Sequence, residues 1–355
     1  MTSVHDVVIV GAGFAGLACA KRAAELDLSV LVIDRQPSPG RYIHTTGILV
    51  QEAQSSWPAP AELTREISRI RLYAPSHRHV ELESTKYRFF ATDTVGLMKF
   101  LVDETRRAGA EVRFNCEFNG VNTRDCYIEL NDLGIKTRYL VGADGVNSRV
   151  ARSAGLDHNT RLLKGLEWEY EPNDLIDDCL HCFVDPAIAP GYIGWVIPGV
   201  GATQVGLAVN QRQNADIDSF VASIDSRFDL SALRVTAKRG GMIPINGLLR
   251  NFFTSQILLL GDAAGMVSPL TAGGIHRSYR YGKLAANAIA DYLQDSGTNP
   301  GIVVRAAYDD AIWKYAARWS FDNLPLTTCM EVGVSIARLF RRVAGKVFYD
   351  RFAID

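Results

Sequence analysis

The sequence predicts an α/β protein, in which an α/β domain is interleaved with a mainly antiparallel β domain and followed by a helical C-terminus. Continuous apolar runs at 7–10 and 30–33 flank a helical segment, a pattern typical of parallel strands buried on both faces. Short strand-like segments dominate residues 160–250, which indicates antiparallel β structure. A further buried strand at 257–260 returns the chain to the first domain, and helical periodicity prevails after residue 296.

Composition narrows the class of protein. The chain has 355 residues, of which 47% are hydrophobic, so it can bury a large core. Its formal net charge of -1 argues against a nucleic-acid partner, because such proteins carry a basic excess. Six scattered cysteines are too few for a disulfide scaffold, and no signal peptide is recognisable. We therefore expect a cytoplasmic protein with reduced thiols.

The change of pattern along the chain predicts a discontinuous organisation without a clean linker. We expect a nucleotide-binding domain, a substrate domain and a C-terminal helical region. Their predicted bounds are 1–66, 91–158 and 251–295 for the first, 67–90 and 159–250 for the second, and 296–355 for the third.

A glycine-rich turn of the form G-x-G-x-x-G spans residues 11–16, directly after a buried strand and at the start of a helix. In a Rossmann-type fold, Gly11 permits the tight turn, Gly13 the approach of a pyrophosphate, and Gly16 close packing of helix on strand. Asp34 ends the next strand, where it would accept hydrogen bonds from ribose hydroxyls. The turn alone leaves NAD and FAD open, as well as a structural turn without a ligand.

Two distant segments favour FAD. Residues 142–149 read Gly-Ala-Asp-Gly-Val-Asn-Ser-Arg, and residues 261–265 read Gly-Asp-Ala-Ala-Gly, with Pro269 and a Gly-Gly-Ile sequence at 273–275 following. In their order and spacing, the three motifs resemble those of the para-hydroxybenzoate hydroxylase superfamily of FAD-dependent oxidoreductases. The resemblance covers residues 4–295.

This resemblance implies a set of FAD-binding residues. Asp262 would bind the ribityl hydroxyls, and Asp144 with Gly145 would shape the loop near the pyrophosphate. The amides of Ile275 and His276 would face the flavin pyrimidine, where a helix N-terminus stabilises the negative charge of the reduced ring. The complete set is Gly11, Gly13, Phe14, Ala15, Gly16, Asp34, Arg35, Arg41, Asp144, Gly145, Gly261, Asp262, Pro269, Gly273, Gly274, Ile275 and His276.

Within the superfamily, the chain is most similar to the geranylgeranyl reductase family. Residues 191–198 resemble the Y-x-W-x-F-P motif of that family's substrate domain, with Ile193 and Ile197 as departures. The loop at 41–49 also lacks the cysteine often found there. The resemblance implies a small apolar organic substrate, contacted by Trp195, Tyr192 and Ile197.

The implied activity is reduction of a carbon–carbon double bond in an isoprenoid or other apolar substrate. FAD would be reduced by NAD(P)H or by a small reduced electron carrier that binds transiently, and His276 is the candidate catalytic proton donor. A monooxygenase of an aromatic or quinone-like substrate is the main alternative. A halogenase, from a partial W-x-W-x-I-P match at 193–198, and a non-catalytic flavin-bearing lipid-binding protein are further alternatives.

Two smaller patterns complete the sequence-based predictions. Cys179 and Cys182 form a lone C-x-x-C in a predicted strand, where they would point to opposite faces, so we expect no metal site. Residues 332–352 form a basic amphipathic segment. Such a segment either contacts a membrane surface peripherally or packs on the body of the protein with a solvated basic face.

Overall fold

The computed structural model describes residues 4–294, 297–309 and 312–349. The chain divides into two compact units, both discontinuous in sequence. Unit 1 comprises Met1–Tyr42, Val95–Arg161 and Pro244–Ala311, and unit 2 comprises Ile43–Thr94, Leu162–Ile243 and Ile312–Asp355. The predicted fold class is confirmed, with parallel and antiparallel sheets and a helical C-terminus.

Unit 1 is built on a sheet in the order β8-β2-β1-β11-β10-β9, with β17 paired to β11. β1, β2, β8, β11 and β17 run parallel, and β9 and β10 form an antiparallel extension. β1 and β2 are continuous apolar runs because both faces of this part of the sheet are covered. The strands are β1 Val4–Val10, β2 Val30–Ile33, β8 Glu111–Arg113, β9 Val121–Thr123, β10 Ile128–Leu130, β11 Ile135–Gly142 and β17 Ile257–Leu259.

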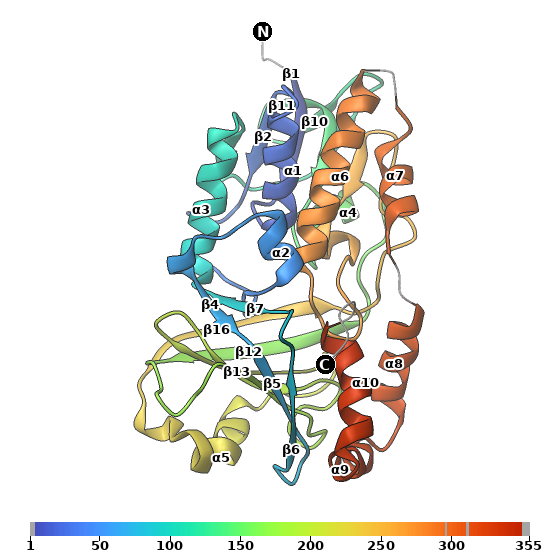
Figure 1. Ribbon diagram of the computed structural model, residues 1–355. Coiled ribbons are helices and arrows are strands. Elements are labelled where there is room, and N and C mark those ends of the chain that lie inside the picture. Colours follow the sequence, from blue (N-terminus) through green and yellow to red (C-terminus); the bar gives the residue numbers. More distant parts are fainter. Residues whose placement is uncertain (1–3, 295–296, 310–311, 350–355) are drawn as a thin grey trace. The chain divides into compact units, whose positions relative to one another are not determined.

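Two helices of unit 1, α1 (Phe14–Ala24) and α6 (Ile275–Leu293), pack against each other (Figure 1). A Cβ on Gly282 would lie only 2.8 Å from the carbonyl oxygen of Ala15, so glycine permits this close approach. The other helical elements of this unit are α3 Thr94–Arg107, α4 Arg149–Ser153, the 3-10 turn η3 Gly261–Ala264 and α7 Pro300–Ala307.

Unit 2 is built on a sheet in the order β16-β12-β15-β14-β13-β5-β6. One face carries a core of alternate strand residues that includes Phe183 and Leu207, and α5 covers it with Phe220 and Phe228. The elements are β5 Arg69–Tyr73, β6 His79–Glu83, β12 Leu162–Tyr170, β13 Cys179–Phe183, β14 Gly194–Pro198, β15 Thr203–Asn210, α5 Ile217–Phe228, η2 Leu230–Ala232 and β16 Val235–Pro244.

A small antiparallel sheet, also in unit 2, links residues far apart in sequence. Strand β7 (Phe89–Thr92) pairs with both β3 (Ile48–Val50) and β4 (Thr64–Ile67), and α2 (Gln51–Ser56) and η1 (Ala61–Leu63) connect these strands. Residues 43–66 therefore belong to unit 2, whereas the sequence placed them with the nucleotide-binding domain. The boundary between the units also divides the predicted C-terminal region, at residue 311.

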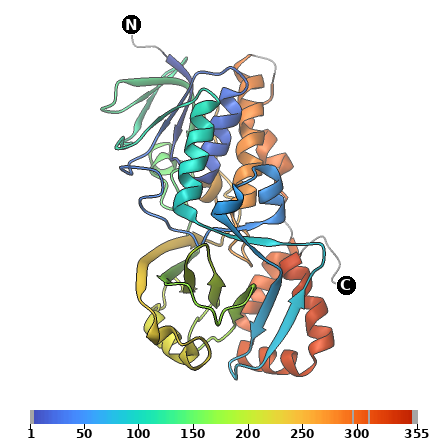
Figure 2. The ribbon, with the colours of Figure 1, turned by 60° about the vertical axis from the view of Figure 1, so that its left-hand side comes forward.

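The C-terminal helices of unit 2 are α8 (Ile312–Asn323), α9 (Leu326–Ser335) and α10 (Ala337–Tyr349). α10 lies against β6 (Figure 2). The Tyr349 hydroxyl donates a hydrogen bond to the carbonyl of Leu82. The amphipathic segment expected at 332–352 is thus two helices that break at Ile336, and its residues 350–352 lie outside the described residues. Among the described residues, no helix is long and apolar enough to cross a membrane.

Candidate active site

The glycine turn of unit 1 is packed where helix meets strand and open where a ligand would approach. Gly11 has a φ of 108°, and a Cβ there would lie 2.3 Å from the carbonyl oxygen of Ala143. A Cβ on Gly16 would lie 2.0 Å from the carbonyl oxygen of Gly11. By contrast, a Cβ on Gly13 would meet no heavy atom within 4 Å. This distribution fits the roles proposed for the three glycines from sequence.

Asp34 ties this turn to the end of β2. Its Oδ2 accepts a hydrogen bond from the amide of Ala12 at 2.7 Å, and its Oδ1 accepts one from the amide of Gln36 at 2.8 Å. Each carboxylate oxygen can accept a further hydrogen bond. Asp34 can therefore hold the turn in shape and still bind a ribose hydroxyl.

The second motif lies against the first through Ala143, and the Asp144 carboxylate binds the first amides of α4, whose N-cap is Ser148. This carboxylate accepts hydrogen bonds from the Ser148 hydroxyl at 2.6 Å and from the amides of Arg149 and Val150 at 2.6 and 3.1 Å. An acidic group at a helix N-terminus is stabilised by the helix dipole. Gly145 follows with a φ of 80°. Asp144 thus shapes the loop without directing its carboxylate at a ligand.

Asp262, in unit 1, is an acidic side chain that could accept hydrogen bonds from a ligand. Desolvation raises its pKa to about 6, and no hydrogen bond within the described residues offsets this cost. One carboxylate oxygen would lie 3.5 Å from a Cβ on Gly274, so Asp262 sits beside the start of α6. Ligand hydroxyls donating to this carboxylate would supply the hydrogen bonds it lacks.

A tight turn directly precedes α6. The Ser268 amide donates to the Gly273 carbonyl at 3.1 Å, and Ala272 has a φ of 53°, which is rare for a residue with a side chain. Gly274 is the N-cap and provides no side-chain cap for Ile275 and the residues after it. The first amides of a helix lack intrahelical acceptors and carry partial positive charge. This end of α6 is suited to the electron-rich edge of a flavin.

Asn159, which the sequence-based prediction missed, joins the second and third motifs. Its Nδ2 donates to the carbonyl of Asp262 at 2.8 Å and to the carbonyl of Val146 at 3.2 Å. It lies outside every recognisable motif, so only the fold reveals its position.

The remaining predicted cofactor residues divide into packing and surface positions. Ala15 lies against Gly261, where a Cβ would be 2.8 Å from the Ala15 methyl, and Phe14 makes an edge-to-face contact with Tyr279. Arg35 and Arg41 are exposed, and His276 is half-buried. Pro269 is buried in the turn before α6.

In unit 2, two of the three predicted substrate residues share one face of the large sheet. Trp195 and Ile197 alternate along β14 on the face opposite α5, and both are buried. The third, Tyr192, lies buried in the loop that precedes β14. Its backbone amide there donates to the carbonyl of Ala189, closing a turn.

A buried polar network fixes Trp195. The indole lies over Gly206, where a Cβ would be 2.5 Å from the ring, and its Nε1 donates to Glu167 Oε2 at 2.8 Å. Arg239 Nε lies 2.8 Å from Glu167 Oε1, and Arg239 also pairs with Glu169. The sequence-based prediction missed this network. The sequence feature that could have indicated the network is the pair Glu167 and Glu169, because carboxylates two residues apart in a strand lie on one face.

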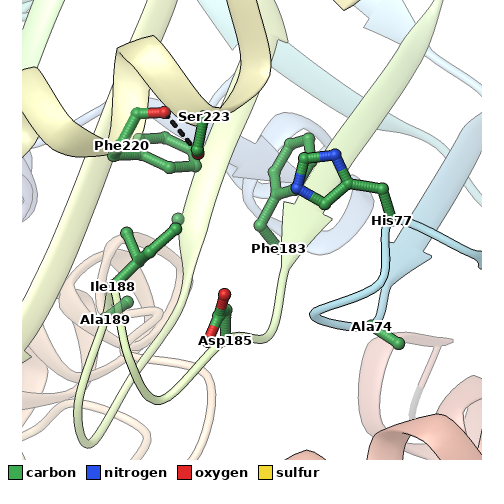
Figure 3. A pocket seen from close by; sticks show the side chains of 9 residues that line it. Ala74, His77, Phe183, Asp185, Ile188, Ala189, Phe220 and Ser223 are labelled. Carbon is green, nitrogen blue, oxygen red and sulfur yellow. Dashed lines mark hydrogen bonds between the residues drawn. The ribbon is translucent and has the colours of Figure 1, made fainter.

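The pocket in Figure 3 lies on the other side of this sheet, among Phe183, Asp185, Phe220 and neighbouring residues. Its volume of ≈ 10 Å³ has room for about one water molecule. It is too small to receive an isoprenoid chain.

The lone C-x-x-C is split by the sheet, as expected. Cys182 shares its face with Trp195, and Cys179 shares the opposite face with His181. Burial raises the pKa of the Cys179 thiol to about 12 and lowers that of His181 to about 4. Asp177, Cys179 and His181 could offer ligand atoms within 4.8 Å of one another, but Arg69 and Arg71 already pair with Asp177 at 2.9 Å. Their positive charge disfavours a cation here.

The three motifs of unit 1 meet around the glycine turn, Asp262 and the start of α6, which is the arrangement of a dinucleotide-binding fold. The chain belongs to the FAD binding domain family, which it matches over residues 4–301. When bound, FAD would be held by these residues of unit 1.

Two reductases similar in sequence to this chain support the predicted resemblance to geranylgeranyl reductases. The chain is 29% identical over 331 residues to digeranylgeranylglycerophospholipid reductase 2 of Methanopyrus kandleri, covering 84% of this chain and 80% of the relative. It is 26% identical to the digeranylgeranylglycerophospholipid reductase of Methanocaldococcus jannaschii, over 83% and 79% of the two chains. The predicted similarity to geranylgeranyl reductases is confirmed, and the chain is an FAD-dependent oxidoreductase.

Solved structures confirm the fold. A geranylgeranyl bacteriochlorophyll reductase-like protein of Thermoplasma acidophilum superposes with a TM-score of 0.85 at 22% identity, covering 95% of this chain and 92% of that protein. A probable FAD-dependent monooxygenase of Pseudomonas aeruginosa has a TM-score of 0.72 at 18% identity, over 92% and 99% of the chains. A flavin-dependent brominase variant matches with a TM-score of 0.72 at 15% identity, over 98% and 100%.

Proposed function

We propose that this enzyme reduces carbon–carbon double bonds in an isoprenoid or similar apolar substrate. The observation that carries the proposal is the likeness, over most of the chain, to reductases named for a digeranylgeranyl lipid. Trp195 and Ile197 support it as apolar side chains on one face of β14 that are candidates to contact such a chain.

The protein's part in this reaction is to bind, orient and exclude water. The bound, reduced FAD would supply the hydride for one alkene carbon, and a proton would complete the addition at the other. The turn at Gly13 and Asp34 would hold the dinucleotide, and Asp262 would accept hydrogen bonds from the ribityl hydroxyls. The amides at Ile275 and His276 would stabilise negative charge on the reduced ring.

The proton and the electrons need their own sources. We propose the His276 imidazole as the proton donor, because it stands in the first turn of α6 and histidine side chains are common general acids. NAD(P)H or a reduced electron carrier would bind transiently to reduce FAD. The sequence has a single dinucleotide fingerprint, at 11–16, which supports a donor without a lasting site.

The reaction can be tested with the holoenzyme after anaerobic photoreduction. Adding a digeranylgeranylglycerophospholipid in detergent should restore the oxidised flavin spectrum without oxygen, and mass spectrometry should find two hydrogens added per reduced double bond. If the lipid fails to reoxidise the flavin and no hydrogenated product forms, the proposed activity is wrong.

The alternative is an FAD-dependent monooxygenase of an aromatic or quinone-like substrate. The Pseudomonas monooxygenase shares the fold of this chain, which is the observation that favours this alternative. That likeness extends only to the fold. Oxygen consumption that rises with such a substrate, together with a hydroxylated product, would support this alternative. A reductase would instead leave the organic product free of added oxygen.

An apolar lipid substrate would be met at a bilayer surface. We therefore propose, as part of this function, peripheral membrane contact of a cytoplasmic enzyme through the segment 332–352.

A further inference from the structure

The outward face of α10 combines apolar and cationic side chains. One face of the helix is formed by residues three, four and seven positions apart, namely Leu339, Arg342, Val343 and Lys346. All four are exposed, and Leu339 and Val343 have 59% and 57% of their surface accessible. Large apolar side chains with this exposure on a helix mark a contact surface when they occur as a group.

The charge of this helix departs from that of the whole chain. α10 contains the cations Arg338, Arg341, Arg342 and Lys346 and no carboxylate, whereas the chain has a net charge of -1. None of these four cations forms an ion pair within the described part of the chain. A partner for this face must therefore be both apolar and negatively charged.

The same helices concentrate further exposed apolar side chains. These are Ile312, Trp313 and Trp319 in α8, Leu324 in the connection that follows, and Val332 and Ile336 at α9 and its end. Tryptophan in particular favours the boundary between water and lipid, because its ring is apolar and its N–H is polar.

The helices that carry these exposed side chains are packed into the fold of unit 2. Phe321, Met330 and Phe340, one from each of the three helices, pack into one apolar cluster with Ala74 and Val184. In addition, Arg78 pairs with Glu331 of α9 at 3.0 Å. The inward sides of the helices are thus occupied by unit 2, and their exposed sides remain for a partner.

We propose that this face of α10 docks on the surface of an anionic lipid bilayer. Leu339 and Val343 enter the boundary between headgroups and acyl chains, while Arg342 and Lys346 bind lipid phosphates. The proposal rests on the proposed function only in that an apolar lipid substrate is met at such a surface. It adds the chemistry of the partner, which is anionic lipid rather than a neutral bilayer or a protein.

The test is sedimentation of the FAD-loaded protein with vesicles, without any substrate. We expect binding to vesicles of phosphatidylcholine with phosphatidylglycerol, little binding to phosphatidylcholine alone, and loss of binding at high salt. The double substitution R342Q/K346Q should weaken the partition coefficient roughly thirtyfold. L339S/V343S should weaken it even at low salt, where the charge attraction is intact.

A matched control removes similar groups from elsewhere on the surface. R124Q/R212Q and L175S change exposed cations and an exposed leucine outside α10, and they should bind vesicles as the unaltered protein does. Equal binding to neutral and anionic vesicles, or full binding by R342Q/K346Q, overturns the proposal. So does a dimer in sedimentation velocity that L339S/V343S dissociates, since the face would then belong to a second copy. None of these outcomes bears on reoxidation of the flavin by an alkene, so the two proposals fail separately.

Discussion

At the scale of single residues, Asp262 has an environment that disfavours its own charge. Burial raises its pKa to about 6 from the ordinary 3.8, so the folded protein without FAD binds more protons than the unfolded chain between these values. Stability contributed by this group is present below pH 4 and is lost as the pH rises through 6. The ionised carboxylate thus lowers the stability of the folded protein until a ligand donates hydrogen bonds to it.

Replacing Asp262 by asparagine removes this charge. We expect the FAD-free D262N protein to be more stable than the unaltered protein by about 1–2 kcal/mol at pH 8, with the difference vanishing near pH 4. Its affinity for FAD should fall. Urea unfolding across this pH range measures the effect, and D125N, which alters an exposed carboxylate, serves as the control. An unchanged pH dependence in D262N would contradict the assignment.

Glu167 provides the second residue-scale prediction. E167L removes the acceptor of the Trp195 indole N–H and one ion-pair partner of Arg239, and we expect a loss of about 3 kcal/mol. E167Q keeps an acceptor for the indole and should lose less. E171Q is the matched control, because its partner Arg234 is 75% exposed and such surface pairs contribute about 0–1 kcal/mol. Equal losses in E167L and E171Q would show that the buried network contributes nothing.

At the scale of elements, glycines decide how closely strands and helices approach. In the large sheet of unit 2, G206A would place a methyl group against the Trp195 ring, and we expect a loss of about 1–3 kcal/mol. G165A lies on the neighbouring strand, where a Cβ would meet nothing closer than 3.7 Å, so it should be nearly neutral. Thermal unfolding of the two variants compares them, and a similar melting temperature would show that the indole can move aside.

The glycine turn of unit 1 allows a parallel comparison that separates folding from binding. G16A should destabilise the FAD-free protein by about 1–3 kcal/mol, because its methyl group would collide with the Gly11 carbonyl. G13A should leave that stability unchanged and weaken FAD binding about tenfold or more, since its methyl group enters the space left for the ligand. Fluorescence titration with FAD gives the affinity. Normal FAD binding by G13A would remove Gly13 from the cofactor site.

At the scale of the whole molecule, FAD binding and folding are linked. A ligand that binds only the folded state at a hundred times its dissociation constant adds about 2.7 kcal/mol to stability. Removing FAD should therefore lower the melting temperature, and amide hydrogen exchange should increase first in α1, η3 and the first turn of α6. An increase confined to unit 2 would place the cofactor elsewhere.

The sequence by itself determined the elements whose signals are local. The apolar runs at 7–10 and 30–33 became β1 and β2, and the buried strand expected at 257–260 became β17. The FAD motifs could be read for the same reason, because glycine conformation, strand burial and a helix start depend on residues a few positions apart.

Only the tertiary structure decided which distant residues meet. Asn159 joins two motifs, Glu167 fixes Trp195 across Gly206, and residues 48–50 pair with β7 in unit 2 rather than unit 1. Each of these contacts depends on strand order and register, which the spacing of residues along the chain does not specify. The face of α10 was likewise set by packing, because the side of an amphipathic helix that is buried depends on what it packs against.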